Sequence, residues 1–159
     1  MQSSDLDLVQ AWARRRDADA YTEVYARHAS LVFGVCLRIL RNTGDAEDVA
    51  QECFMELARS GGYIRTSVPA WLHRLATRRS LDKIRGDQRR LKRETSFASD
   101  RPVSGNLPWS DIEEHIDQAV SALPEKERAL VIERYFNGIS EGALAERFGL
   151  TRSQVRYRL

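Results

Sequence analysis

The residues most able to do chemistry in this sequence are basic side chains gathered near two aromatic ones. Between Arg65 and Arg93 there are ten Lys or Arg residues and only two acidic residues. An excess of positive charge on this scale is typical of a surface that binds the phosphates of a nucleic acid. Tyr63 and Trp71 lie beside it and could stack on unpaired bases. A basic helix face can also be merely solvated, but so many cations with so few acids favour nucleic acid.

A second charged segment has the opposite sign. From Gly44 to Glu56 the sequence has five acidic residues and no basic one. Its apolar residues recur at helical spacing, which predicts a helix that begins near Asp45, with Asp45 as N-cap, and continues to Arg59. Acids in a first turn also stabilise the helix dipole. Two interpretations therefore stay open, a docking surface for a partner or a solvated helix face.

The last twenty residues have the spacing of a helix-turn-helix. Ala145 would lie where two helices cross, Gly149 at the turn, and Val155 facing back from the second helix. Thr151 and Gln154 predict a capping box that starts this second helix. Its outward residues would suit the major groove of DNA, namely Arg152, Ser153, Arg156 and Tyr157. A plain helical hairpin is the alternative.

The elements that must position these residues are all helical by their periodicity, and we expect an all-α fold. Ser4 and Asp17 are expected to cap a short and a long N-terminal helix, and Pro69 to lie at the start of the basic helix. Residues 91–109 lose the periodicity and are rich in Ser, Pro, Gly and Asn, which predicts a flexible linker. The expected organisation is two small helical domains, residues 1–90 and 110–159, joined by that linker.

Several classes of protein are disfavoured by what the sequence lacks. It has no apolar run long enough to span a bilayer and no signal peptide, so we expect a cytoplasmic protein. Cys36 and Cys53 fall on apolar helix faces outside any CxxC pair, as buried thiols do. His28, His73 and His115 are too dispersed for a metal site. An enzyme built on His28 and Cys36 would lack an oxyanion loop and a phosphate cradle, so we expect no catalysis, no metal and no cofactor.

Three stretches carry a resemblance to a known family. They are GDAEDVAQECF at 44–54, AWLHRLATRRSLDKIRGDQRR at 70–90, and LPEKERALVIERYFNGIS at 123–140 followed by the helix-turn-helix. In type and order they resemble bacterial RNA polymerase sigma factors of the small, two-domain extracytoplasmic-function (ECF) group. The resemblance covers nearly the whole chain from about Leu8, and relates the first expected domain to sigma region two and the second to region four.

The resemblance implies an alternative sigma factor, which directs transcription initiation and has no catalysis of its own. The acidic helix would dock on the clamp helices of core RNA polymerase through Asp45, Glu47, Asp48, Gln51 and Glu52. The basic segment would open the minus-ten promoter element and read it as a single strand through Tyr63, Arg65, Trp71, Arg74, Arg78, Asp82 and Arg85. The last domain would read the minus-thirty-five element as duplex through Arg152, Ser153, Arg156 and Tyr157. An anti-sigma factor or another inhibitory regulator is a further implied partner.

Two departures from the family pattern bear on these expectations. Where the family commonly has Asn, this chain has Arg78, so the family's base preference at the minus-ten element does not carry over to this chain. Family members usually continue past the position of Leu159, and we expect a recognition helix of barely two turns, as in a chain truncated at its C-terminus. The alternative function is a helix-turn-helix DNA-binding regulator that does not engage polymerase, which would leave the acidic helix and the basic helix without a role.

Overall fold

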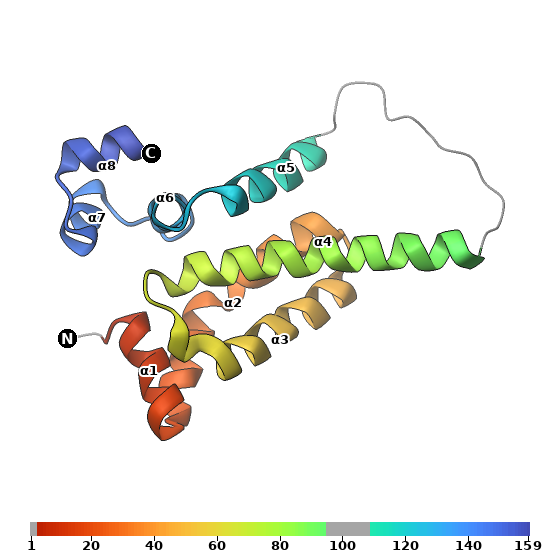
Figure 1. Ribbon diagram of the computed structural model, residues 1–159, viewed down its shortest axis with the longest axis horizontal. Coiled ribbons are helices and arrows are strands. Elements are labelled where there is room, and N and C mark those ends of the chain that lie inside the picture. The colour runs from red at the N-terminus through yellow and green to blue at the C-terminus, as the bar shows by residue number, and fades with distance from the viewer. Residues whose placement is uncertain (1–2, 95–108) are drawn as a thin grey trace.

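The computed structural model describes residues 3–94 and 109–159, and within those ranges every regular element is helical (Figure 1). The expected all-α fold is confirmed. The elements are α1 (Asp5–Arg15), α2 (Ala18–Leu40), α3 (Thr43–Ser60), the short 3-10 helix η1 (Gly61–Tyr63), α4 (Val68–Glu94), α5 (Trp109–Ala122), α6 (Glu125–Val131), the π-helical turn η2 (Ile132–Phe136), α7 (Glu141–Phe148) and α8 (Arg152–Arg158).

The N-terminal helices begin at polar caps. The Ser4 hydroxyl accepts the backbone N–H of Asp7, and the Asp17 carboxylate accepts that of Ala20, both as expected. The expected start of α3 was wrong. Asn42 is the N-cap, since its side-chain oxygen accepts the N–H of Asp45 at 2.9 Å. An Asn caps a helix as well as an Asp does, so α3 begins two residues earlier and Asp45 becomes a first-turn residue.

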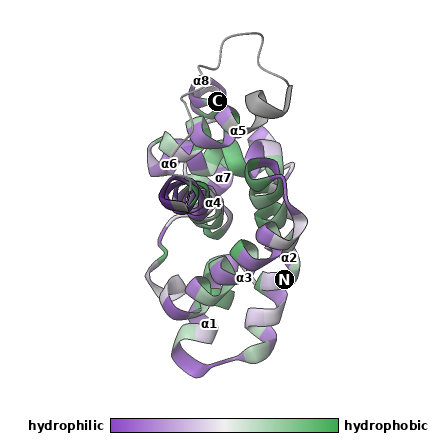
Figure 2. Cartoon of the chain, turned by 90° about the vertical axis from the view of Figure 1, so that its right-hand side faces the viewer, coloured by the Kyte–Doolittle hydropathy of each residue, from purple (hydrophilic) through white to green (hydrophobic). Residues whose placement is uncertain are grey.

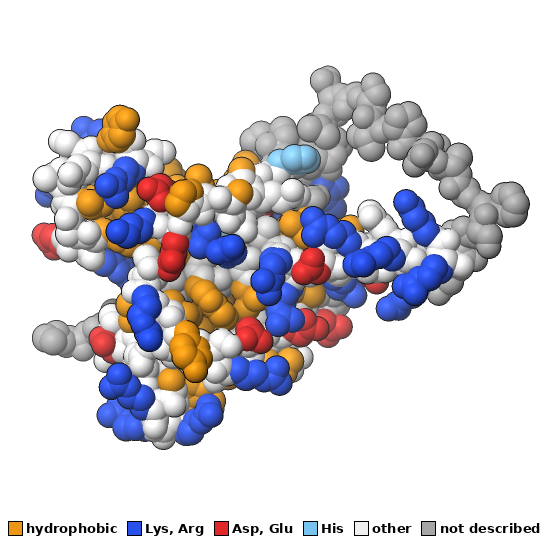
Figure 3. All heavy atoms as spheres, in the orientation of Figure 1, with side chains coloured by type: hydrophobic (Ala, Val, Ile, Leu, Met, Phe, Trp, Pro, Cys, Tyr) orange, Lys and Arg blue, Asp and Glu red, His pale blue; other side chains and the backbone are white. Residues whose placement is uncertain are grey.

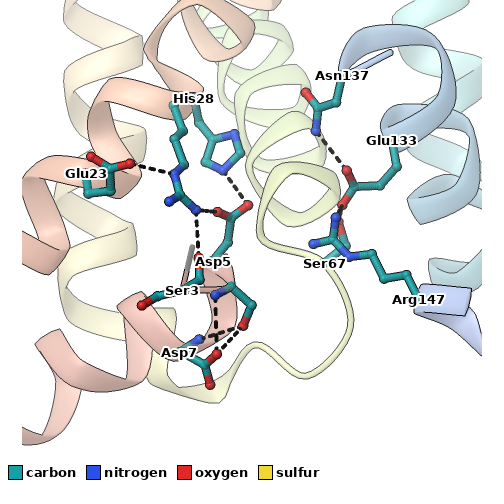
Figure 4. A network of polar contacts seen from close by, with 11 residues as sticks. Ser3, Asp5, Asp7, Glu23, His28, Ser67, Glu133, Asn137 and Arg147 are labelled. Atoms are coloured by element: carbon teal, nitrogen blue, oxygen red, sulfur yellow. Dashed lines mark hydrogen bonds and ion pairs between the residues drawn. The ribbon is translucent and has the colours of Figure 1, made fainter. Parts of the chain in front are cut away.

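Helices α1 to α4 form the first helical unit around one apolar core, in which α2 packs against both α3 and α4. Cys36 and Cys53 are buried there as free thiols, as expected. Polar contacts attach the start of α1 to α2. Asp5 pairs with His28 and with Arg27 of α2, each at 2.8 Å (Figure 4).

The second helical unit, α5 to α8, packs on α2 and on the side of α4 that faces away from α3 (Figure 2). Ala70 of α4 meets Val120, Ala129 and Ile132 in a small apolar cluster. Helix α4 continues to Glu94, four residues into the expected linker. The rest of that linker up to residue 108 lies outside the described residues, and the domain boundaries stay a prediction.

Two buried carboxylates of the second unit accompany this apolar cluster. Asp117 of α5 accepts from Arg38 of α2 at 2.8 and 2.9 Å and pairs with His73 of α4 at 3.0 Å. Glu133 of η2 accepts from the Ser67 hydroxyl at 3.2 Å and pairs with Arg147 at 3.2 Å (Figure 4). Both carboxylates are about 1% exposed, so each depends on these partners for the hydrogen bonds that water would otherwise provide.

Two glycines give a prediction in which the same substitution has opposite effects. Gly149 ends α7 with φ +63°, whereas Gly86 lies inside α4, and a Cβ at either position would meet nothing within 4 Å. Gly149→Ala should destabilise the second unit by about 1–2 kcal/mol through backbone strain. Gly86→Ala should stabilise the protein by up to about 1 kcal/mol through helix propensity. Urea unfolding followed by circular dichroism measures both, and a shift of the same sign in both variants would contradict the assignment.

The contacts of Asp5 give a pH-dependent prediction. Burial alone would raise the pKa of Asp5, but the hydrogen bonds from His28 and Arg27 outweigh that effect, so the pKa of Asp5 lies below its ordinary value. The ionised carboxylate therefore stabilises the fold above the unfolded pKa of about 3.9, and that contribution is lost as pH falls through the folded pKa. Asp5→Asn should lower the free energy of unfolding by about 1–3 kcal/mol at neutral pH. In this variant the free energy of unfolding should also fall less steeply as the pH is lowered, which is the acid limb of its pH dependence. The exposed Asp19→Asn is the control, and an unaltered acid limb in the Asp5 variant would refute the assignment.

Candidate nucleic-acid interface

The acidic helix α3 and the basic helix α4 lie side by side, and part of their charge is paired between them. Asp45 lies 3.0 Å from Lys83, and Glu52 lies 3.0 Å from Arg79. The hydrogen bond with Asp45 raises the pKa of the Lys83 ammonium. These pairs hold the two helices together, so Arg79 and Lys83 belong less to the free basic surface than the sequence suggested.

The rest of the acidic face is open. Glu47, Asp48 and Gln51 are exposed, and in the described part of the chain no side chain makes a hydrogen bond or ion pair with them. Met55, at 45% exposure, is a large apolar side chain on the same face, two turns after Asp48. Met55 was not among the residues expected from the sequence, although its spacing of two helical turns from Asp48 places it on the same face. A face of free acids beside an exposed apolar side chain suits a protein partner better than it suits DNA.

Five of the seven residues expected at the minus-ten element line one groove of about 630 Å³, formed by the loop before α4, the first turns of α4 and the second unit. They are Tyr63, Arg65, Trp71, Arg74 and Arg78. Tyr63 is 80% exposed and Trp71 is half-buried, so both present ring surface to the groove. This groove therefore combines cations with flat aromatic surfaces, as a single-strand binder requires.

The other two expected residues lie farther along α4. Asp82 lines a neighbouring groove that contains Arg78, Arg79, Arg89, Arg90 and Arg93. Arg85 lies on another part of the surface, with Gln88, Arg89 and Lys92, and is paired with Asp82 at 3.3 Å. Lys and Arg side chains continue along α4 in the space-filling view, with the acids of α3 beside them (Figure 3). The basic surface is thus a track along α4 rather than one site.

Local contacts set the shape of the groove. The Arg65 guanidinium donates to the carbonyl of Gly62 at 2.7 Å, so it is folded onto its own loop. Arg74 and Arg78 are exposed, and no carboxylate in the described ranges pairs with them. Arg128 of α6 also lines the groove, and burial together with the charge of Arg74 lowers the pKa of Arg128. Arg128 was not expected at this groove, because it lies far from the basic segment in the sequence.

The helix-turn-helix is built as its sequence predicts. Ala145 and Val155 are buried in the small core of the second unit, and Gly149 makes the turn with φ +63°. Thr151 and Gln154 form the expected capping box at the start of α8, with bonds of 2.9 and 3.2 Å. The four residues expected to read DNA, Arg152, Ser153, Arg156 and Tyr157, are all exposed.

His28 and Cys36, the pair considered for an enzyme, each have another partner in the structure. His28 Nε2 pairs with Asp5 at 2.8 Å, while the buried Cys36 thiol is hydrogen-bonded with Cys53. Within residues 3–94 and 109–159 no group of three or more His, Cys, Asp or Glu side chains could hold a metal ion. None of the described helices is both long and apolar enough to cross a membrane.

Comparison with protein families identifies two regions of the chain. Residues 24–90 match the model for sigma-70 region 2, and residues 113–159 match the model for sigma-70 region 4. Among curated proteins, the chain is 28% identical over 166 residues to the ECF RNA polymerase sigma factor SigK of Mycobacterium tuberculosis, covering 99% of this chain and 89% of the relative. The SigK of Mycobacterium sp. (strain KMS) is 26% identical, with 99% and 86% covered.

Two solved structures resemble the chain more distantly. CnrH in complex with the cytosolic domain of CnrY has a TM-score of 0.47 at 17% identity, covering 98% of this chain and 90% of the other. The sigma factor RpoE of Bartonella quintana, in complex with the anti-sigma factor NepR, has a TM-score of 0.46 at 17% identity, covering 89% of each chain. Likeness at this level supports no functional conclusion.

Proposed function

Because the chain belongs to the sigma-70 family, and within it to the ECF group, it is an alternative sigma factor, and we propose which of its surfaces perform each part of that function. The observation that carries the proposal is the separation of three surfaces on one chain: the open acids of α3, the cationic and aromatic groove of α4, and the exposed residues of α8. A sigma factor needs one surface for polymerase and two for promoter DNA. Members of the family are initiation factors without catalysis of their own.

We assign polymerase docking to α3. Glu47, Asp48 and Gln51 would make the direct contacts, with Met55 as an apolar neighbour. Asp45 and Glu52, also expected here, are engaged with Lys83 and Arg79 and would contribute mainly by orienting α3 against α4. Acidic side chains steer association toward a basic partner surface and weaken binding to other partners. Sigma factors that compete for the same core polymerase need this selectivity.

We assign reading of the minus-ten strand to the groove of Tyr63, Arg65, Trp71, Arg74 and Arg78. The arginines would neutralise phosphates while the rings stack on unpaired bases. A base removed from the duplex loses its stacking energy, and the aromatic wall would replace part of it. Asp82 and Arg85, farther along α4, would meet DNA only where the strand continues along the helix.

We assign reading of the minus-thirty-five element to α8, with Arg152, Ser153, Arg156 and Tyr157 entering the major groove. Arg156 is paired with Glu141 at 2.9 Å but stays highly exposed, so this bond can be exchanged for one to a base or a phosphate. Because core polymerase and chromosomal DNA are in the bacterial cytoplasm, we propose that this protein acts there. An anti-sigma factor or another inhibitory regulator that covers one of these surfaces is proposed as a further partner.

Docking can be tested by reversing one charge. Asp48→Arg should lower affinity for bacterial core RNA polymerase about a hundredfold, because it removes an attraction and introduces a repulsion at the interface. The matched control is Asp19→Arg, which reverses an exposed acid in the first turn of α2. Equal binding by both variants would refute docking through α3. If the natural chain itself fails to bind, the regulator without polymerase becomes the better explanation.

Strand reading can be tested by the salt dependence of DNA binding. Arg74→Ala combined with Arg78→Ala should reduce the slope of log K against log salt by about 1.4 for single-stranded DNA, since each lost phosphate contact removes about 0.7. The measurement is a titration of the polymerase complex with single-stranded DNA at several salt concentrations. The control is Arg14→Ala combined with Arg15→Ala, because both of these arginines are exposed on α1. An unchanged slope in the α4 variant would exclude these two phosphate contacts.

A further inference from the structure

Arg128 of α6 is a buried cation that has no carboxylate partner among the described residues. It is only 4% exposed, and its Nη1 donates to the carbonyls of Ser121 and Leu123 at 3.1 and 2.8 Å. These carbonyls lie at the end of α5 and offset part of the positive charge. The Nε of Arg128 is buried, and in the described ranges it has no hydrogen-bond partner. Buried arginines are ordinarily paired with an acid, so this guanidinium remains able to bind an anion.

A second cation without an acidic partner lies close to Arg128. Burial lowers the pKa of Arg128, and the nearby charge of Arg74 on α4 lowers it further, so the two guanidinium groups repel each other. Arg74 is exposed, and in the part of the chain that the structure describes no carboxylate pairs with it. An oxyanion placed between the two guanidinium groups would replace one repulsion by two attractions.

The acids that line this groove do not supply that anion. Glu125 favours the charged form of Arg128, but within residues 3–94 and 109–159 the two side chains form no ion pair. Glu56 accepts from the Ser60 hydroxyl at 2.6 Å and lies 3.5 Å from Arg79, so its charge is already engaged. The two guanidinium groups are therefore not neutralised within the groove.

Aromatic surface lies beside these cations. Trp71 is about one helical turn before Arg74 on the same face of α4, and Tyr63 lines the same groove. Hydrophobic and basic side chains lie together where the two helical units meet (Figure 3). The groove volume of about 630 Å³ falls within the range of about 300–1,000 Å³ that is typical of small-molecule sites. A ligand that joins phosphate groups to a planar ring would contact both kinds of surface at once.

We propose that this groove binds a phosphorylated nucleotide such as a nucleoside diphosphate. Its phosphates would lie between Arg74 and Arg128, and Arg78, one turn farther along α4, would extend the phosphate site. Its base would stack on Trp71 and Tyr63. The proposal goes beyond the function proposed above, in which the groove serves a DNA strand and Arg128 has no role. A bound nucleotide would exclude that strand from the residues they share.

Nucleotide binding can be measured on the free chain by isothermal titration calorimetry at low salt and without divalent cations. ADP is the nucleotide probe, and inorganic pyrophosphate supplies two phosphates without a base. The natural chain should bind both. Arg74→Gln should weaken the binding of both probes about tenfold or more, because it removes a charge-assisted contact to phosphate. Arg128→Gln should have the same effect, and if circular dichroism shows that this variant does not fold, the Arg74 variant carries the test.

The base is tested by a variant that leaves the arginines in place. Tyr63 is 80% exposed, so Tyr63→Ala should leave the fold intact. It should weaken ADP about tenfold through lost stacking, while the affinity for pyrophosphate stays the same. The control is Arg15→Gln, which removes an exposed cation of α1 and should bind both probes as the natural chain does.

Three outcomes would overturn the nucleotide site. The natural chain could bind neither probe at millimolar concentration, or it could bind ADP no better than the Arg74 variant does, which would indicate nonspecific attraction. If Tyr63→Ala weakened ADP no more than pyrophosphate, the groove would hold an anion without a base. These titrations use neither DNA nor polymerase, so their failure would leave the proposed strand reading to its own test by salt dependence.

Discussion

Burial on several sides of the first turns of α4 is the constraint on which the rest of this structure depends. Leu72 and Ala76 face the core shared with α2 and α3, while Ala70 and His73 face the second unit. A helix with neighbours on two sides leaves a narrow strip for solvent, and Arg74 and Arg78 occupy that strip. The direction in which the arginines point is therefore fixed by the apolar and polar packing of their neighbours.

The charges of α3 and α4 divide into two kinds because of this arrangement. Those that face across the helix pair, such as Glu52 and Arg79, neutralise each other and contribute little net field. Those that face outward keep their full sign, negative at Asp48 and positive at Arg78. Opposite fields on neighbouring surfaces let a protein partner and a nucleic acid approach the same small unit from different directions.

Much of this could be predicted from the sequence because it is local. Helix periodicity, the caps at Ser4 and Asp17, and the turn at Gly149 all depend on residues within one or two turns of each other. The exposure of the proposed DNA-reading residues of α8 follows from the same periodicity.

The parts that could not be predicted depend on contacts between residues far apart in the sequence, or on a choice between two residues equally suited to one position. Arg38 and Asp117 are 79 residues apart, and no local pattern indicates that an acid in a polar segment will be buried against both Arg38 and His73. The role of Arg128 in the groove is nonlocal in the same way. At the start of α3, Asn42 and Asp45 are both good caps, and sequence alone does not decide between them.

Helix α8 has seven residues, of which Val155 alone is buried. Thr151 and Gln154 fix where the helix starts, and Val155 fixes its orientation on α7, so the remaining side chains are almost independent of fold stability. Substitutions there can alter which bases are favoured with little effect on folding. Under the proposed assignment, new DNA preferences can therefore arise in α8 one residue at a time, while the surface proposed to bind polymerase, on a different helical unit, stays unchanged.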